Sequence, residues 1–455
     1  MKTFEKDLSK GNVAKQMILF ALPFLLSNFI QSLYNVADMI IVGNMSGTLK
    51  QCAESMSGVN IGSQLTFNVT NAIIGLCVGG TVLIGQYMGS NQRKELEETV
   101  ETMFTALILL AAVASILVLI FKNDILVLLR TPKEAFNEAS DYMSITMLGT
   151  IFIFAYNALS AVMRGMGDSK NPLKFVTIAC CVNVVLDIIL VKGFGMRAKG
   201  AALATVISQA LSVMLCIIYL EKNNFVFKFR LSSFKINKVR LKMLLKIGVP
   251  TSVQNVVTGL SFLFLTALVN NFGVDASAAL GAVSKFNGFG ILPAVAMSSS
   301  ISAMSAQNIG AGEVKRAQKT MQIGLSIALF LSSIVWLLAY LYPEPVLKIF
   351  SQNPDVVKAG TSYIKYFKFD YLIVPFIFSL NGLYIGSGHT MFSLINNICS
   401  AVIIRVPVSF VLGITFNLGL EGMGMAAPIA SGTSAVIALI YFFTGRWKNS
   451  TIIDF

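Results

Sequence analysis

Gln86-Tyr87-Met88-Gly89, followed by Arg93-Lys94, recurs 221 residues later as Gln307-Asn308-Ile309-Gly310, followed by Lys315-Arg316. Each copy follows a long apolar segment. At the same offset Gly165-Met166-Gly167-Asp168 corresponds to Gly386-Ser387-Gly388-His389, and Tyr142 corresponds to Tyr363. Pro23 corresponds to Pro250 at an offset of 227, so a few residues were gained near the point where the first repeat joins the second. Landmarks that match in order at nearly one offset predict two homologous halves, an arrangement typical of membrane transporters.

The composition is that of a membrane protein. Hydrophobic residues make up 55% of the 455 residues and charged residues 13%, whereas soluble domains carry roughly 25% charged residues. The mean hydropathy is +0.73, and each membrane span needs about 20 apolar residues. We predict an all-α integral membrane protein with twelve spans, at 14–42, 57–84, 96–120, 136–163, 172–192, 199–220, 243–270, 280–306, 318–341, 357–384, 393–414 and 422–443.

The spans divide into two six-helix bundles that are expected to surround a central cleft. We predict an N-lobe at 1–220, a basic cytoplasmic linker at 221–242 and a C-lobe at 243–455. If both termini are cytoplasmic, that side of the membrane holds 22 of the 35 basic residues, the other side holds 12, and Arg405 lies within a span. The excess of Lys and Arg predicts a multi-pass protein of the cell inner (plasma) membrane with both termini in the cytoplasm.

Several classes of function are disfavoured. The net charge of +13 comes from short loops between spans and not from a basic domain, so no nucleic-acid partner is expected. One His and six scattered Cys make no structural metal site or disulfide spacing. We find no nucleophile–base constellation and no P-loop, so we expect neither an enzyme nor an ATP-driven pump, and no cofactor.

Two carboxylates stand out because an acid in the centre of a span costs about 2.5–3.5 kcal/mol on insertion scales. Asp38 lies late in the first span, four residues after Tyr34, and Asp187 lies late in the fifth span, four residues after Asn183. Residues four apart share a helix face, so each acid has a polar neighbour. Thr205 in the sixth span and Asn157 in the fourth span are expected to add further oxygens.

The repeat provides an internal control for this polar set. Its counterparts in the second half are Ile404 for Asn183, Val408 for Asp187 and Ala427 for Thr205, and the region around Asp38 corresponds to the apolar stretch 265–268. A feature that the scaffold needs would occur in both halves. We therefore predict a cation-coupling or substrate site in the N-lobe.

Two chemistries fit such a site, and the sequence does not separate them. Burial disfavours the charged form of a carboxyl, so these acids can load and release a proton near neutral pH. Alternatively, Asp38, Asp187 and Asn183 can hold Na⁺, a hard cation that favours oxygen ligands. The second half has two charges of its own, Asp370 in the tenth span and Arg405 in the eleventh, which form either an ion pair or a second cation site.

These motifs resemble the multidrug and toxic compound extrusion (MATE) family, and within it the DinF-like bacterial and archaeal branch. The resemblance covers nearly the whole chain and rests on the motifs Pro23…Tyr34-Asn35-x-x-Asp38…Gly43, Gln86-x-x-Gly89, Arg164-Gly165-x-Gly167-Asp168 and Asn183-x-x-x-Asp187. It implies a twelve-helix antiporter that exports drugs and organic cations against H⁺ or Na⁺. It also implies a cation site at Tyr34, Asp38, Asn183, Asp187 and Thr205. Some other branches place an acid in the seventh span, and this sequence has none between Pro250 and Asn271.

We therefore expect a secondary active antiporter for cationic or amphipathic small molecules, acting as a monomer in the lipid bilayer. The alternatives are a lipid-linked saccharide flippase and a narrow-specificity metabolite exporter. A pyrophosphate-bearing substrate needs Arg or Lys in the cavity. Arg405 is the only basic residue in the middle of a span, against three acids, and this balance favours cationic or neutral cargo.

Overall fold

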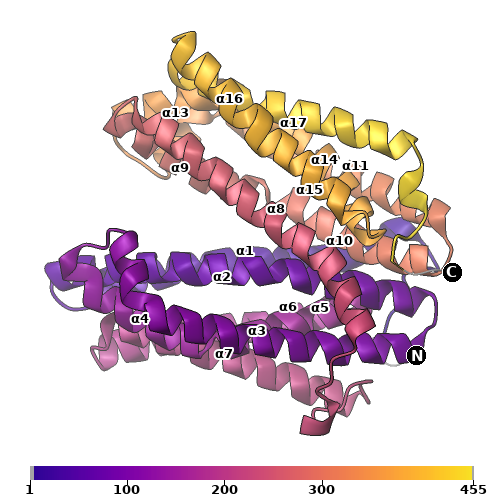
Figure 1. Cartoon of the computed structure of the whole chain (residues 1–455). Coiled ribbons are helices and arrows are strands. Elements are labelled where there is room, and N and C mark those ends of the chain that lie inside the picture. Colours follow the sequence, from indigo (N-terminus) through magenta and orange to yellow (C-terminus); the bar gives the residue numbers. More distant parts are fainter. Residues whose placement is uncertain (1–4, 453–455) are drawn as a thin grey trace. The chain divides into compact units, whose positions relative to one another are not determined.

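The computed structural model describes residues 5–452, with all their side chains except those of Ala72 and Leu231. This part of the chain is almost entirely helical and contains no β-strand (Figure 1). The α-helices are α1 (Val13–Met45), α2 (Leu49–Gly89), α3 (Arg93–Leu128), α4 (Phe136–Leu148), α5 (Thr150–Gly165), α6 (Lys170–Asp187), α7 (Arg197–Lys222), α8 (Lys238–Asn270), α9 (Val274–Gly290), α10 (Leu292–Gly310), α11 (Val314–Leu341), α12 (Pro343–Lys348), α13 (Pro354–Phe367), α14 (Asp370–Gly386), α15 (Thr390–Ile398), α16 (Arg405–Phe410) and α17 (Gly419–Phe443).

Short helical segments of other kinds join or extend these helices. The 3-10 segments are η1 (Lys133–Ala135), η3 (Leu231–Ser233) and η6 (Arg446–Lys448). The π-helical segments are η2 (Ile188–Gly193), η4 (Cys399–Ile404) and η5 (Val411–Thr415). Segments η2 and η5 occupy nearly equivalent places in the two halves, whereas η4, directly before Arg405, has no counterpart in α6.

The described helices confirm the predicted fold class. Ten helical segments are long and apolar enough to cross a membrane, and two bent helix pairs bring the number to twelve if each pair is one span. Each of these twelve segments overlaps one predicted span. Residues 1–4 and 453–455, the outermost ends of the predicted lobes, lie outside the described range.

Two of the confirmed spans, 136–163 and 357–384, are bent and are not single regular helices. The pair Lys133–Leu148 and Thr150–Gly165 bends by 48°, and the pair Pro354–Phe367 and Asp370–Gly386 bends by 53°. The first break lies at Gly149, and the repeat offset takes Gly149 to Asp370, the first residue of α14. Asp370 therefore lies at a helix N-terminus within a span, where the helix dipole favours a negative charge.

The chain forms two compact units that exchange segments. The first unit contains Leu26–Met88 and Gln92–Gly248 with Met1–Lys6, and the second contains Asp7–Leu25 and Val249–Phe455 with Gly89–Asn91. Helix α1 thus begins in the second unit and ends in the first, and α8 does the reverse. Both helices change unit within three residues of an internal proline, Pro23 in α1 and Pro250 in α8. Proline removes a backbone hydrogen bond inside a helix and loosens it there.

The repeat is visible in the backbone of each unit. A Cβ added to Gly165 would lie 2.8 Å from the carbonyl oxygen of Thr81, and a Cβ on Gly386 would lie 2.5 Å from that of Ser302. Both pairs are related by the 221-residue offset. Gly167 and Gly388 adopt φ values of +87° and +89°, a region that favours glycine. The matched Gly-x-Gly motifs therefore serve the scaffold, one glycine for close helix packing and one for the turn after it.

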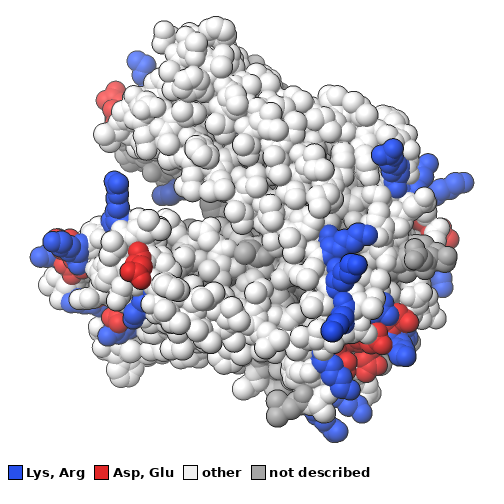
Figure 2. All heavy atoms as spheres, in the orientation of Figure 1, with Lys and Arg blue, Asp and Glu red and all other residues white. Residues whose placement is uncertain are grey.

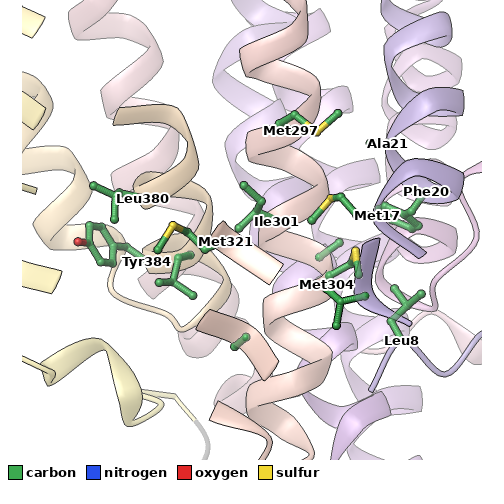
Figure 3. Packing of buried hydrophobic residues seen from close by; sticks show 14 of the residues in the cluster. Leu8, Met17, Phe20, Ala21, Met297, Ile301, Met304, Met321, Leu380 and Tyr384 are labelled. Atoms are coloured by element: carbon green, nitrogen blue, oxygen red, sulfur yellow. The ribbon is translucent and has the colours of Figure 1, made fainter. Parts of the chain in front are cut away.

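The start of α1 is anchored in the core of the second unit. Met17 and Phe20 of α1 pack with Ile301 and Met304 of α10 in a buried cluster that also includes Tyr384 of α14 (Figure 3). In each unit the charged side chains gather at helix ends, and the surface between is largely uncharged (Figure 2). Exposed aliphatic side chains such as Leu22 and Ile116 cover that surface, as a lipid-facing wall requires.

Candidate functional site

Helices α1, α6 and α7 carry the two buried acids of the first unit and their nearest polar neighbours. On α6 the buried residues are Pro172, Phe175, Val176, Ala179, Asn183 and Asp187, which form one helix face. Asn183 and Asp187, the two polar residues of this face, are 1% and 0% exposed. Asp38 of α1 is 8% exposed. Three polar side chains are thus buried together, although burying apolar side chains would cost less free energy.

Asn183 connects the two acids. In the amide orientation that satisfies both of its polar atoms, Nδ2 donates to Asp38 Oδ1 at 3.0 Å and to Asp187 Oδ2 at 3.1 Å. Its Oδ1 accepts from the backbone amide of Thr205 at 3.2 Å. One nitrogen therefore lies within hydrogen-bond distance of both carboxyls, so the two acids are close neighbours.

The other predicted members lie at different distances from this centre. The Tyr34 hydroxyl is 3.1 Å from Thr205 Oγ1, and Tyr34 is close enough to Asp38 to interact with it electrostatically. Asn157 is different, because its Nδ2 donates to the backbone carbonyl of Ile153 in its own helix at 2.8 Å. Among the described residues no hydrogen bond joins the Asn157 side chain to either acid.

Tyr142 of α4 is a member that sequence reasoning missed as a site residue. Its side chain is 6% exposed, lies near Thr205, and is close enough to Asp38 and Asp187 to interact electrostatically with both. Gly62 of α2 packs against its ring, where a Cβ would come within 2.6 Å of Cδ1. The match of Tyr142 with Tyr363 in the repeat was visible in the sequence, but it indicated only a shared scaffold position.

No basic group compensates the two acids. Within residues 5–452, no Lys or Arg nitrogen lies within 4 Å of the Asp38 or Asp187 carboxyl. Asp187 Oδ1 is buried and has no hydrogen-bond partner there. Buried carboxylates are normally paired, and an unsatisfied buried oxygen is unusual enough to indicate a functional role.

This arrangement suits a small cation. The neighbouring carboxyls, the tyrosine and threonine hydroxyls and the amide offer mostly oxygen atoms, which protons and hard cations prefer. No group of three or more His, Cys, Asp or Glu side chains that could hold a metal occurs in the described part of the chain. The donor set therefore fits a transiently bound ion better than a resident structural metal.

The second unit has a polar cluster with a different charge balance. The Arg405 guanidinium carbon lies 4.5 Å from the centroid of the Phe262 ring, and Arg405 is close enough to Tyr363 to interact with it electrostatically. Asp370 is 8% exposed and lies near Ser431, while its Oδ1 has no hydrogen-bond partner in the described range. No Asp370 oxygen lies within 4 Å of an Arg405 nitrogen, so the two charges interact only across a longer distance.

The comparisons with known proteins identify the family. The MatE family model matches residues 23–189 and 250–411, more than half of the chain, and its two segments begin at Pro23 and Pro250. The chain therefore belongs to the MatE family, whose members are transporters and not enzymes. This confirms the family resemblance, and the matched segments coincide with the two repeats.

Several relatives match over nearly their full length. The chain is 28% identical to the probable multidrug resistance protein YpnP of Bacillus subtilis over 97% of both chains. It is 24% identical to an FAD transporter of Shewanella oneidensis over 93% of both chains. A MOP superfamily transporter from Pyrococcus furiosus, whose reversed binding-pocket polarity was taken to suggest a different function, shares the fold with a TM-score of 0.90, 20% identity and 98% coverage of both chains.

Proposed function

We propose that this protein is a secondary active antiporter that exports cationic or amphipathic small molecules in exchange for H⁺ or Na⁺. One observation carries the proposal. Asp38 and Asp187 are buried beside each other, share the Asn183 amide, and have no basic group in contact. A pair of acids in this setting binds a positive charge more readily than it tolerates two negative ones.

Exchange follows from competition for this negative charge. A proton or Na⁺ on the Asp187 side of the pair supplies the partner that its Oδ1 lacks. Departure of that ion restores the negative charge, which attracts either another ion or a cationic substrate. One charge moving through 150 mV supplies roughly 3.5 kcal/mol, enough for a substrate gradient of a few hundred-fold.

The substrate class rests on two supports. Several relatives that match along their whole length are named multidrug resistance or multidrug export proteins, including those of Bacillus subtilis and Staphylococcus haemolyticus. Asp38, Asp187 and Asp370 also outnumber Arg405 in the middle of the predicted spans, a balance that favours cationic or neutral cargo. We further propose a plasma-membrane protein with both termini in the cytoplasm, on the basis of the distribution of Lys and Arg. We also propose that it acts as a monomer.

The test is ethidium efflux from proteoliposomes under an imposed pH gradient or an imposed Na⁺ gradient. We expect wild-type efflux to follow one of the two gradients and Asp38→Asn to abolish the driven component. Asp275→Asn is the matched control, because Asp275 is an exposed acid in the first turn of α9 and should leave efflux unchanged. Full driven efflux by Asp38→Asn would refute a coupling role for the first unit.

A narrow-specificity exporter of an anionic metabolite is the second candidate. Arg405 lies under the second unit's Phe262 ring without a contact ion pair, and a relative that matches over 93% of its length is named an FAD transporter. Absence of ethidium efflux under both gradients, together with flavin nucleotide efflux that depends on Arg405, would favour this candidate.

A further inference from the structure

A groove of about 700 Å³ in the second unit lies outside the candidate cation site. It is formed by the segment Ser9–Ala14, which leads into α1, and by the start of α11. Four basic side chains and one acid line it: Lys10, Lys315, Arg316, Lys319 and Glu313. Its volume falls within the range of about 300–1,000 Å³ that small-ligand sites occupy. The groove is therefore large enough for a small anionic group and has an excess of positive charge.

The arginine and the lysines of this groove have different roles. Arg316 holds the N-terminal segment in place, with Nη1 donating to the Gly11 carbonyl at 2.7 Å and Nη2 donating to Gln16 Oε1 at 2.6 Å. In contrast, neither Lys315 nor Lys319 has a hydrogen bond or an ion pair within residues 5–452. Both side chains are exposed and line the groove. Arg316 thus builds the groove, and the two lysines are available to a ligand.

The position of these bases on α11 is unfavourable without an anion. The helix begins at Val314, has no acid in its first turn, and its preceding residue Glu313 makes no side-chain cap. The positive end of the helix dipole destabilises nearby cations and favours anions. Lys315 and Lys319 are also four residues apart, so the two like charges repel each other across one turn. A bound anion would relieve both effects.

The repeat shows that the scaffold does not require this basic character. The 221-residue offset takes Arg316 and Lys319 to Glu95 and Glu98 at the start of α3. In the first unit these acids pair with Arg240 of α8, at 3.9 Å and 3.1 Å. Both units therefore attach the start of a long helix at this place. The second unit has bases at two positions where the first has acids, whereas Lys315 corresponds at the same offset to another base, Lys94. The bases at Arg316 and Lys319, present in one half only, indicate a site and not a packing requirement.

The location of the groove identifies the source of the anion. Helix α11 has 28 residues and is about 42 Å long, longer than the hydrocarbon core of about 30 Å. We place its first turn, which carries Lys315 and Arg316, in the headgroup layer, so that Ile323, the lining residue of α11 farthest from that end, lies closer to the hydrocarbon. A phospholipid places its phosphate and its acyl chains at these same two depths.

We propose that this groove binds the phosphate-bearing headgroup of an anionic phospholipid through Lys315 and Lys319. Lys10, whose Nζ lies 3.6 Å from Asp7 Oδ2, stands at the opposite wall. The bound lipid links the segment before α1 to α11. It thereby holds the beginning of α1 in the second unit, on the N-terminal side of Pro23.

The test measures thermal unfolding of the full chain in nanodiscs of phosphatidylcholine, with and without phosphatidylglycerol. We expect phosphatidylglycerol to raise the unfolding temperature of the wild type by about 3–5 °C, as a ligand of the folded state does. The double variant Lys315→Gln/Lys319→Gln should lose this shift. In pure phosphatidylcholine it should unfold no earlier than the wild type, because two cations leave a helix N-terminus; this comparison shows that the variant is folded.

Lys238→Gln/Lys242→Gln is the matched control, since it removes an exposed lysine pair of the same spacing from the start of α8. It should keep the full shift. If phosphatidylglycerol shifts the unfolding temperature of the two double variants equally, the effect is a general one of charge, and the proposed site is overturned. A saturable shift of the wild type with millimolar inorganic phosphate in phosphatidylcholine discs, lost in Lys315→Gln/Lys319→Gln, would overturn the lipid as the source. Because the readout is unfolding, failure here is separate from failure of the transport proposal.

Discussion

Tyr142 and Tyr363 occupy equivalent positions in the two repeats, and each lies beside buried ionisable groups, but the charges differ. Tyr142 interacts with two acids, Asp38 and Asp187, whereas Tyr363 interacts with an acid and a base, Asp370 and Arg405. The first cluster therefore carries an uncompensated negative charge and the second is close to neutral. The scaffold around the two tyrosines is therefore shared, whereas only the cluster in the first unit has a net negative charge that attracts a cation.

Among the substitutions that test this contrast, Asp187→Asn should have the largest effect. The variant keeps the shape of the side chain but removes the charge that a coupling ion would neutralise. We expect the sustained substrate gradient to fall from up to a few hundred-fold to about one, because the driving ion no longer binds. Substrate accumulation in proteoliposomes at a fixed membrane potential measures this ratio. A sustained gradient equal to that of the wild type would remove the distinction between the two clusters.

Asn183→Leu tests whether the shared amide makes the two acids act as one site. Hydrogen bonds to charged groups contribute about 1.5–3 kcal/mol each, so we expect a change of roughly 10–100-fold in apparent affinity for the coupling ion. Ile404→Leu, at the equivalent position of the second unit, should leave the affinity unchanged. The ion concentration at half-maximal efflux reports both. Equal effects of the two substitutions would indicate a packing role for this position.

Gly165→Ala and Gly386→Ala test the part that the two units share. A Cβ at either position would collide with a backbone carbonyl, so we expect both variants to lose stability by about 1–3 kcal/mol. Thermal unfolding in detergent micelles should show similar losses for the two. A large loss for one and none for the other would mean that the repeats do not carry equivalent scaffolds.

The smallest effect is expected for Asp370→Asn. Asp370 has no contact ion pair with Arg405, and Arg405 keeps its contacts with Phe262 and Tyr363 when the acid is neutralised. We expect driven efflux to stay within about threefold of the wild type, since the charges interact only at longer range. Initial rates under the same ion gradient provide the measurement. Loss of driven efflux in this variant would place a second coupling site in the second unit.

Much of the site was predictable because helix periodicity is a local property. The spacing of Asn183 and Asp187 predicts a common face, and both side chains lie on the buried face of α6. The absence of polar counterparts at Ile404 and Val408 also singled out the first unit. Asn157 shows the limit of this reasoning, because its amide bonds to its own helix and a span assignment does not reveal where a side chain points.

The sequence by itself determined the membrane class, the twelve spans and the duplication, because apolar segment length and repeated motifs are one-dimensional signals. Only the tertiary structure decided that Tyr142 joins the acids, that the spans break at Gly149 and before Asp370, and that α1 and α8 each change unit beside a proline. These features depend on which helices meet and at what angle. Helix packing of that kind arises from contacts between residues distant in the chain, which no local pattern records.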